Sequence, residues 1–362
     1  MKIVQGLLAI CLLLYSSTAA SAAGEYLLRG EAVFSTHCAS CHGSSGKPDP
    51  DSPLVKALGV VPADFDDKLF NSREPVSAWK TVVTHGGPAL GFSEMMPAFG
   101  GTLSEADIDA VLAYIKTDLG GEHDYPDGDL NLYLPLRTKK VFPEDEWVWK
   151  QRYSGQDGDD AWKSTLEYEF RIGKRAQGIM EVTHETKGSR SEFGHLEPGF
   201  KYVFSHDRRA GFILAGAAQV AVPLNRDAHW EFLPYIAVGK IINDDFTFQG
   251  SARLKLDLEQ SDNSSAELAG VVHWTHTNWP RNIFPALEVV AEVPFERGTG
   301  AARKDAVQIS VLPQARIGLN KRGNIALNVG VELPVNDTGR YDWRGYIYLI
   351  WDFADGGLFE GW

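Results

Sequence analysis

From about residue 144 onward, hydrophobic and polar residues alternate with a period of two. Between Leu166 and Ile172, for example, apolar side chains alternate strictly with charged ones. This period places successive side chains on opposite faces of a β-strand, so each such stretch predicts a strand with one apolar and one polar face. The pattern predicts twelve antiparallel strands, at 145–153, 162–174, 177–187, 195–206, 210–223, 229–242, 245–259, 264–277, 283–295, 305–318, 324–335 and 341–353.

The length and spacing of these strands favour a transmembrane β-barrel over a soluble sheet. Tilted strands need about 9 to 11 residues to cross a membrane, and short turns alternate with longer loops in outer-membrane barrels. Nine of the ten tryptophans follow residue 146, several near strand ends, as an interfacial aromatic belt requires. The expected compact connections are 174–176, 206–209, 243–244 and 320–323, and longer ones include 186–194 and 296–304.

A soluble β-sandwich is the competing interpretation, because its strands alternate too. Proline within a central strand loses a ladder hydrogen bond, which favours the sandwich, although three of the four prolines recur in similar contexts and so indicate a shared bend. The barrel explains better why the polar face carries many charges, which would fill a lumen. These prolines are Pro198, Pro234, Pro285 and Pro313, and the expected lumen residues are Glu167, Glu169, Arg171, Glu181, Arg253, Lys255, Glu267, Glu288, Arg316, Glu332 and Arg344.

The chain before residue 120 has a helical pattern instead. Ser104 and Asp107 form a capping-box sequence at the start of an apolar stripe that runs from Ile108 to Leu119 and ends at a glycine pair. Residues 120–143, rich in glycine and proline, predict a linker. Residues 1–23 predict a cleaved export signal, with a basic start, a short apolar run and the small-residue site at 20–22.

Export leaves a mature chain with only two cysteines, and both belong to one motif. Cys38 and Cys41 are followed directly by His42, in the C-x-x-C-H pattern of covalent c-type haem attachment. Two thiols on one helical turn reach both vinyl groups, while the imidazole binds iron. A thioredoxin-like pair has no use for His42, and a zinc site lacks a second ligand pair.

The sixth iron ligand must be a thioether or an imidazole. Met96 is the predicted ligand, because the loop around it contains glycines and Pro97, which suit a backbone passing close to a flat ring. Met95, His85 and His37 are the alternatives.

These residues resemble a class I cytochrome c domain of the cbb3-subunit type over residues 26–119. The matching residues are Gly30, Phe34, Cys38 to Gly43, Met96 to Gly101, Leu103-Ser104 and Ala113 to Lys116. The resemblance implies an all-α domain over 24–119, one covalent haem c, His42 and Met96 as axial ligands to its iron, and one-electron transfer.

Charge adds a weaker inference about partners. The formal net charge is -13, which argues against duplex nucleic acid as a partner because its phosphates need a basic surface. Residues 24–125 carry 15 acidic and 7 basic side chains, which favours a periplasmic redox partner with a basic surface. No Ser-His-Asp grouping or phosphate-binding glycine loop indicates a hydrolase or transferase, whereas oxidoreductase activity stays open.

The whole mature chain resembles the porin-cytochrome fusions of iron-oxidising bacteria. The predicted fold is thus α+β: an all-α cytochrome c domain, then a barrel of about twelve strands over 144–362 in the outer membrane, with the haem domain on the periplasmic side. The implied function is single-electron exchange between periplasmic carriers and an external or pore-diffusing redox compound. A porin with an accessory haem domain and a soluble periplasmic electron carrier are the alternatives. The redox partner, the direction of electron flow and the state of the lumen stay open.

Overall fold

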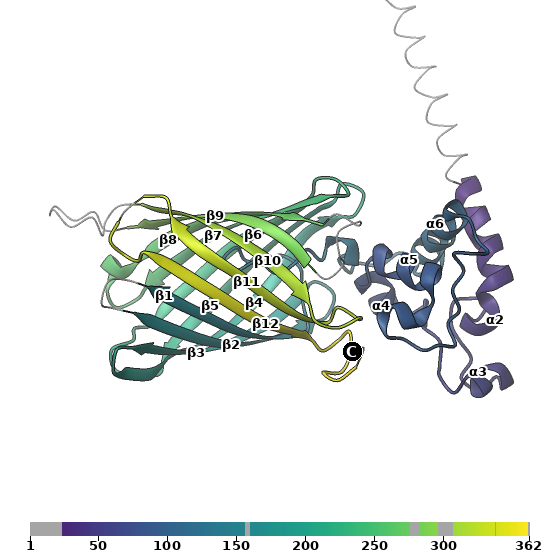
Figure 1. The fold of residues 1–362 in the computed structure, drawn as a ribbon, viewed down its shortest axis with the longest axis horizontal. Helices are drawn as coiled ribbons and strands as arrows, with labels where there is room; N and C mark the ends of the chain where they lie inside the picture. Colours follow the sequence, from purple (N-terminus) through teal and green to yellow (C-terminus); the bar gives the residue numbers. More distant parts are fainter. Residues whose placement is uncertain (1–23, 156–159, 276–282, 296–306, 337, 361–362) are drawn as a thin grey trace, which may run out of the picture. The chain divides into compact units, whose positions relative to one another are not determined.

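The computed structural model describes residues 24–155, 160–275, 283–295, 307–336 and 338–360, and the predicted export signal at 1–23 lies outside them. The chain divides into two compact units, Met1–Tyr125 and Pro126–Trp362 (Figure 1). Among the described residues, no helix combines the length and apolar character needed to cross a membrane.

The first unit is helical, as predicted. Its helix α6 begins at the expected capping box, in which Ser104 and Asp107 bond to each other's backbone N–H groups. The elements are a helix over residues 24–37, α2 (Ala39–His42), α3 (Pro53–Leu58), α4 (Lys68–Arg73), α5 (Val76–His85), the 3-10 helix η1 (Gly87–Leu90), α6 (Glu105–Tyr114) and the π-helix η2 (Ile115–Leu119).

The first helix and α6 cross at a glycine in this unit. A Cβ atom on Gly30 would clash with the carbonyl oxygen of Ala110 and lie 2.8 Å from the Cβ of Tyr114. The close approach buries one apolar cluster between the helices, which includes Phe34, Trp79, Ile108, Val111 and Leu112. The predicted apolar stripe of α6 is therefore core.

The second unit is a closed barrel of twelve strands, each paired with its neighbours in sequence, with β1 closing on β12 (Figure 1). All pairings are antiparallel, and the barrel prediction is confirmed. The strands are β1 (Glu146–Gly155), β2 (Ala161–Ile172), β3 (Ala176–Lys187), β4 (Arg190–Asp207), β5 (Phe212–Pro223), β6 (Glu231–Ile241), β7 (Phe246–Asp257), β8 (Ser265–Trp274), β9 (Ile283–Pro294), β10 (Gln308–Gly318), β11 (Ile325–Pro334) and β12 (Trp343–Asp352).

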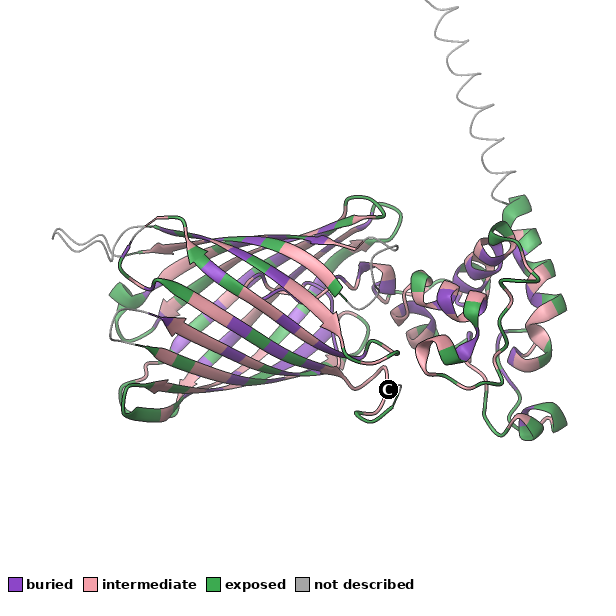
Figure 2. Ribbon diagram, in the orientation of Figure 1, coloured by how far each residue is buried: buried purple, intermediate pink, exposed green. Residues whose placement is uncertain are grey.

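Burial alternates along the strands in the sense opposite to that of a soluble barrel (Figure 2). On β2, Glu167 and Glu169 are buried at 5% and 6% exposure, whereas Leu166 and Phe170 between and beside them are 42% and 36% exposed. Charged residues thus face the lumen and apolar residues face outward. Other exposed apolar side chains on the strands include Ile236, Leu268, Leu287, Val289, Ile347 and Leu349.

One predicted connection is wrong. The expected long loop over 186–194 does not form, because β3 continues to Lys187 and β4 starts at Arg190. Gly188, with φ +59°, permits the tight turn between them, since a left-handed conformation costs glycine little.

Three of the strand prolines interrupt a ladder, each on one side of its strand. Pairing skips Pro198 between β4 and β5, Pro234 between β6 and β7, and Pro313 between β10 and β11. Proline has no N–H to donate, and the barrel tolerates its loss on one side because the other ladder continues. The second unit therefore accommodates the residues that had favoured a sandwich.

Residues 126–145, here called the lumen segment, belong to the barrel unit rather than to a free linker. After the 3-10 helix η3 (Gly128–Leu130), Leu130 and Phe142 pack with Val203 and Ile213 of β4 and β5. Leu134 and Leu136 pack with lumen-facing residues of β1 and β10 to β12. The segment therefore contacts strands on several sides of the barrel and occupies part of its interior.

Candidate functional site

The two cysteines and the histidine of the C-x-x-C-H motif lie on one helical stretch. Cys38 follows the first helix, and the backbone N–H groups of Cys41 and His42 both donate to its carbonyl oxygen, at 3.1 and 3.0 Å. Both thiols are free. One turn of helix thus presents two thiols and an imidazole together.

The imidazole of His42 is oriented by a backbone acceptor. Its Nδ1 lies 3.0 Å from the carbonyl oxygen of Ala63, which can only accept, so Nδ1 carries the proton and Nε2 keeps a free lone pair. The ring also stacks on Phe65, with centroids 4.6 Å apart. Burial lowers the pKa of His42, which favours the neutral form that a metal requires.

The thiol of Cys38 has the wrong character for a redox dithiol. Burial raises its pKa to about 11. Reactive cysteines in redox pairs have a lowered pKa, because the thiolate is the nucleophile. The environment therefore suits a thiol that is bonded to an apolar group rather than one that exchanges disulfides.

The loop that contains the methionine pair distinguishes the two sulfurs. Met96 packs against the apolar cluster that also contacts Cys38, whereas Met95 is 49% exposed. The N–H of Gly87 donates to the carbonyl oxygen of Met96 at 2.9 Å, and Gly86 has a φ of +84°. This hydrogen bond anchors the loop at Met96.

The remaining ligand candidates fit less well. His85 is exposed at the end of α5, and the ring of His37 contacts Phe99 edge-on with centroids 5.9 Å apart. The donor set of His42, a thioether and two thiols around one apolar cluster fits a c-type haem. His42 and Met96 would hold the iron, and Cys38 and Cys41 the vinyl groups.

Comparisons with known proteins agree with this geometry. The family described as cytochrome C oxidase, cbb3-type, subunit III matches residues 26–115. Cytochrome c6 of Bumilleriopsis filiformis is 37% identical over 87 residues, which are 24% of this chain and 84% of that protein. Cytochrome c6 of Microcystis aeruginosa is 38% identical over 86 residues, 24% and 89% of the two chains. The chain therefore belongs to the cytochrome c family through its N-terminal domain, which implies haem c and electron transfer.

The barrel shows partial similarity to solved structures. The NanC porin is 11% identical, with a TM-score of 0.42, over 57% of this chain and 98% of its own. An outer membrane channel from Pseudomonas putida F1 is 11% identical, with a TM-score of 0.47, over 61% and 99% of the two chains. The protein is thus a cytochrome c domain fused to a closed twelve-strand β-barrel.

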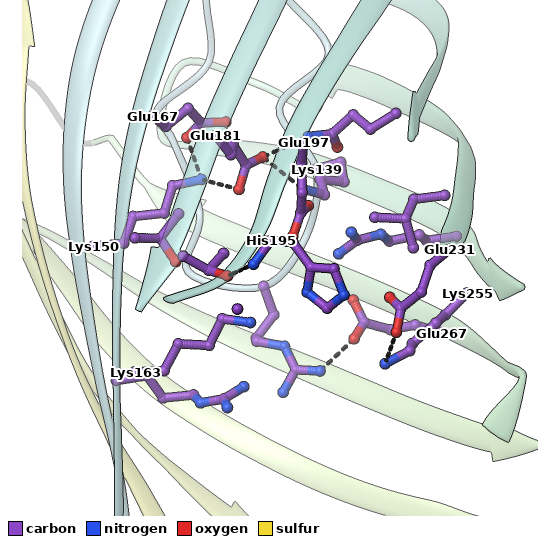
Figure 3. A pocket seen from close by; sticks show the side chains of 18 of the residues that line it. Lys139, Lys150, Lys163, Glu167, Glu181, His195, Glu197, Glu231, Lys255 and Glu267 are labelled. Atoms are coloured by element: carbon purple, nitrogen blue, oxygen red, sulfur yellow. Dashed lines mark hydrogen bonds and ion pairs between the residues drawn. The ribbon is translucent and has the colours of Figure 1, made fainter. Parts of the chain in front are cut away.

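The barrel encloses a charged cavity of about 780 Å³, here called the lumen cavity (Figure 3). Lys150 forms ion pairs with Glu167 and Glu181, and Lys255 lies 2.8 Å from Glu231. The expected lumen residues that line it are Glu167, Glu169, Glu181, Arg253, Lys255, Glu267 and Arg344. The other four expected lumen residues, Arg171, Glu288, Arg316 and Glu332, contact the lumen segment instead.

The lumen segment forms the base of this cavity. Residues 134–140 line the cavity, and its walls continue to the barrel end at Glu192, Asn225 and Asn263. Behind the base, Leu130, Leu132, Val141 and Phe142 are buried, none more than 5% exposed. The lumen is thus a charged cavity with an apolar packed base.

Three carboxylates hold the base in place through one guanidinium. Arg137 forms ion pairs with Glu267, with Glu292 at 2.6 Å and with Glu332 at 2.9 Å. Its backbone N–H donates to Glu288 at 3.2 Å. Sequence reasoning missed this role of 137–140; the basic run after alternating leucines at 130, 132, 134 and 136 was the available signal.

Proposed function

We propose that this protein is an outer-membrane monohaem cytochrome that carries single electrons between a periplasmic redox protein and a redox compound on the other side. The observation that carries the proposal is the burial pattern of the barrel. Apolar side chains cover its outside and charged ones fill its inside, on the same chain as a c-type haem motif. That pattern is the one a lipid environment selects.

The barrel geometry supports a location in the outer membrane. Its strands have 10 to 18 residues, enough to cross a bilayer when tilted. The exposed tryptophans Trp147, Trp149, Trp162 and Trp343 lie near strand ends, where an interfacial belt forms. An even strand count returns both ends to one side, and with an export signal that side is the periplasm, where we place the haem domain.

The first unit supplies the residues for one haem. Cys38 and Cys41 would attach it covalently, and His42 and Met96 would ligate the iron. When bound, haem would supply one-electron chemistry, and a methionine ligand would raise its reduction potential relative to a second histidine ligand. The chain's own contribution is orientation: Ala63 fixes the His42 tautomer, and the Gly87 contact positions the Met96 loop.

The acidic surface of this unit supports a choice of partner. It carries 15 acidic and 7 basic side chains over residues 24–125. Transient electron-transfer complexes are small and electrostatically steered, so the partner we propose has a basic face.

The packed base argues against the alternative of a general porin. Free diffusion of solutes needs a continuous water path, whereas the described lumen segment fills one end with buried apolar side chains. The soluble-carrier alternative would expose the large apolar exterior to water, which is unfavourable by about 25 cal/mol for each Å².

Location is tested by haem-staining gels of outer-membrane fractions, with boiled and unboiled samples. A haem-bearing band whose mobility changes on boiling supports the fusion. A soluble band without the change would refute it.

Electron transfer is tested in proteoliposomes that contain an entrapped electron acceptor and a neutral sugar. An impermeant reductant is added on the haem side, and His42→Ala serves as the control without the imidazole ligand. We expect acceptor reduction with wild type only and retention of the sugar in both. Rapid sugar efflux without His42-dependent reduction would favour the porin alternative.

A further inference from the structure

Arg152 is a lumen-facing guanidinium that forms no ion pair among the described residues; the carboxylate that acts on it electrostatically, Glu185, is bound to Lys163. It lies on β1 and lines the lumen cavity. Among the described residues, no carboxylate comes within ion-pair distance of it, and its Nε is buried without a hydrogen-bond partner. Burying a charged donor in this way is costly unless something pairs with it.

The neighbours of Arg152 add to the positive charge. Lys163 is its direct partner across the β1–β2 ladder, and like charges in that position repel. Lys163 itself is 3.0 Å from Glu185. Arg344 of β12 is one step further along, opposite Ser154.

The carboxylates near Arg344 are already shared. Arg344 lies 3.4 Å from Glu292 and 3.7 Å from Glu332, and both of these carboxylates also bind Arg137. Three cations on β12, β1 and β2 therefore face the cavity side by side, and the middle one, Arg152, forms no ion pair among the described residues.

A second lumenal arginine shows that this arrangement is specific. Arg253 on β7 also has a buried Nε without a hydrogen-bond partner. Its direct partner on β8, however, is Glu267, so the local charge is compensated rather than reinforced. Figure 3 shows Lys163 away from the labelled carboxylates Glu231 and Glu267.

We propose that Arg152, flanked by Lys163 and Arg344, binds a small oxyanion that enters the lumen cavity, with a carboxylate or a phosphate group as the recognised chemistry. A guanidinium offers two parallel N–H donors that match either group. An anion there would satisfy the unpartnered donor and offset the repulsion among three cations. The site is independent of the haem and its redox role.

The test is isothermal titration calorimetry on the full-length, haem-loaded protein in detergent at low ionic strength, with oxalate and inorganic phosphate as separate probes. Arg152→Gln should raise Kd by about tenfold to a hundredfold, the loss expected for a hydrogen bond to a charged group. Glu185→Gln should lower Kd, because it removes the carboxylate that competes for Lys163. Arg253→Gln is the matched lumenal control and should change Kd much less.

Binding of oxalate alone would identify carboxylates as the ligand class, and binding of phosphate alone would identify phosphates. The tighter binding of Glu185→Gln is a gain that misfolding cannot mimic, and heat-shifted mobility verifies the barrel of each variant. The proposal is overturned if neither probe binds saturably, or if Arg152→Gln and Arg253→Gln weaken binding equally.

Discussion

Replacing Arg137 with methionine should release the lumen segment from the barrel interior. Methionine keeps much of the length and apolar stem of arginine but removes the guanidinium that binds Glu267, Glu292 and Glu332. Glu267 would then lose its ion-pair partner. Glu292 and Glu332 would keep the longer contacts to Arg344, at 3.4 and 3.7 Å. The mutual repulsion of the three carboxylates disfavours the packed state of the segment.

The size of the effect follows from burial. Arg137 is 12% exposed, Glu332 is fully buried, and the other two carboxylates keep about a fifth of their exposure. Breaking a buried ion pair costs about 3 to 5 kcal/mol. Because two of the three carboxylates are partly exposed to water, we expect the packed state of the lumen segment to lose about 3 kcal/mol, the lower end of this range. That value shifts the equilibrium between packed and released segment roughly 150-fold towards release.

Limited trypsin digestion of the protein in detergent measures the released fraction. Lys139 and Lys140 lie inside the lumen, so cleavage there requires release, and its rate follows the released population when release is fast. Cleavage at these sites, identified by mass spectrometry, should be much faster in Arg137→Met. Arg208→Gln is the control: Arg208 makes ion pairs with the lumen segment but is 38% exposed, so its loss should cost about 0 to 1 kcal/mol.

A second change separates repulsion from lost packing. Adding Glu332→Gln to Arg137→Met removes the buried carboxylate that had lost its ion pair with Arg137, and should restore part of the protection. Planar-bilayer conductance should follow the same order, lowest in wild type and highest in the single variant. Equal cleavage rates in wild type and Arg137→Met would refute the idea that these charges hold the segment.

Four further predictions concern the two units. Met96→Ala should lower the haem reduction potential by a sizeable part of the roughly 0.8 V that axial ligands span, whereas Met95→Ala should leave it unchanged in a redox titration. The hydrogen bond from a neighbouring arginine lowers the pKa of Asp107 to about 2, so its stabilising contribution is complete above pH about 4 and is lost as the pH falls through 2. The melting temperature of the wild type should fall as the pH is lowered from about 4 to about 2, whereas that of Asp107→Asn should not show this extra fall. The same dependence of melting temperature on pH in both proteins would contradict the prediction. Gly30→Ala should destabilise the cytochrome domain by about 1 to 3 kcal/mol in denaturant titrations followed by haem absorbance, because the added Cβ meets the backbone of α6. Leu287→Arg, on the exposed side of β9, should cost about 2 to 4 kcal/mol in barrel assembly into lipid vesicles, and unimpaired assembly would argue against a lipid-facing surface.

The strands were predictable because alternation is a local property. A period of two specifies both the strand and the face on which each residue lies, so Glu167 and Leu166 could be assigned to opposite sides from the sequence alone. The loop over 186–194 was wrong because residues 184–192, which include no apolar side chain, still pair on both sides of a tight turn at Gly188. A polar stretch alone therefore does not distinguish a hairpin end from a loop.

The lumen segment was not predictable for the opposite reason. Its partners are far along the chain: Asn328 donates to the carbonyl oxygen of Leu134, and Tyr348 to that of Leu136, 194 and 212 residues away. A stretch with glycines, prolines and alternating leucines is as typical of a linker as of a buried segment. Only the folded barrel provides the interior in which these leucines are buried.

The order of residues along this chain is sufficient for the haem-attachment motif, its capped helix and the twelve amphipathic strands, because each is a pattern within about one element. Whether Met95 or Met96 turns inward depends on how the loop meets α5, and whether the barrel is open or blocked depends on what folds into it. The isolation of Arg152 likewise arises only when β12 closes on β1. Such features are decided by the tertiary structure, since they depend on which distant groups share a volume too small for water to screen them.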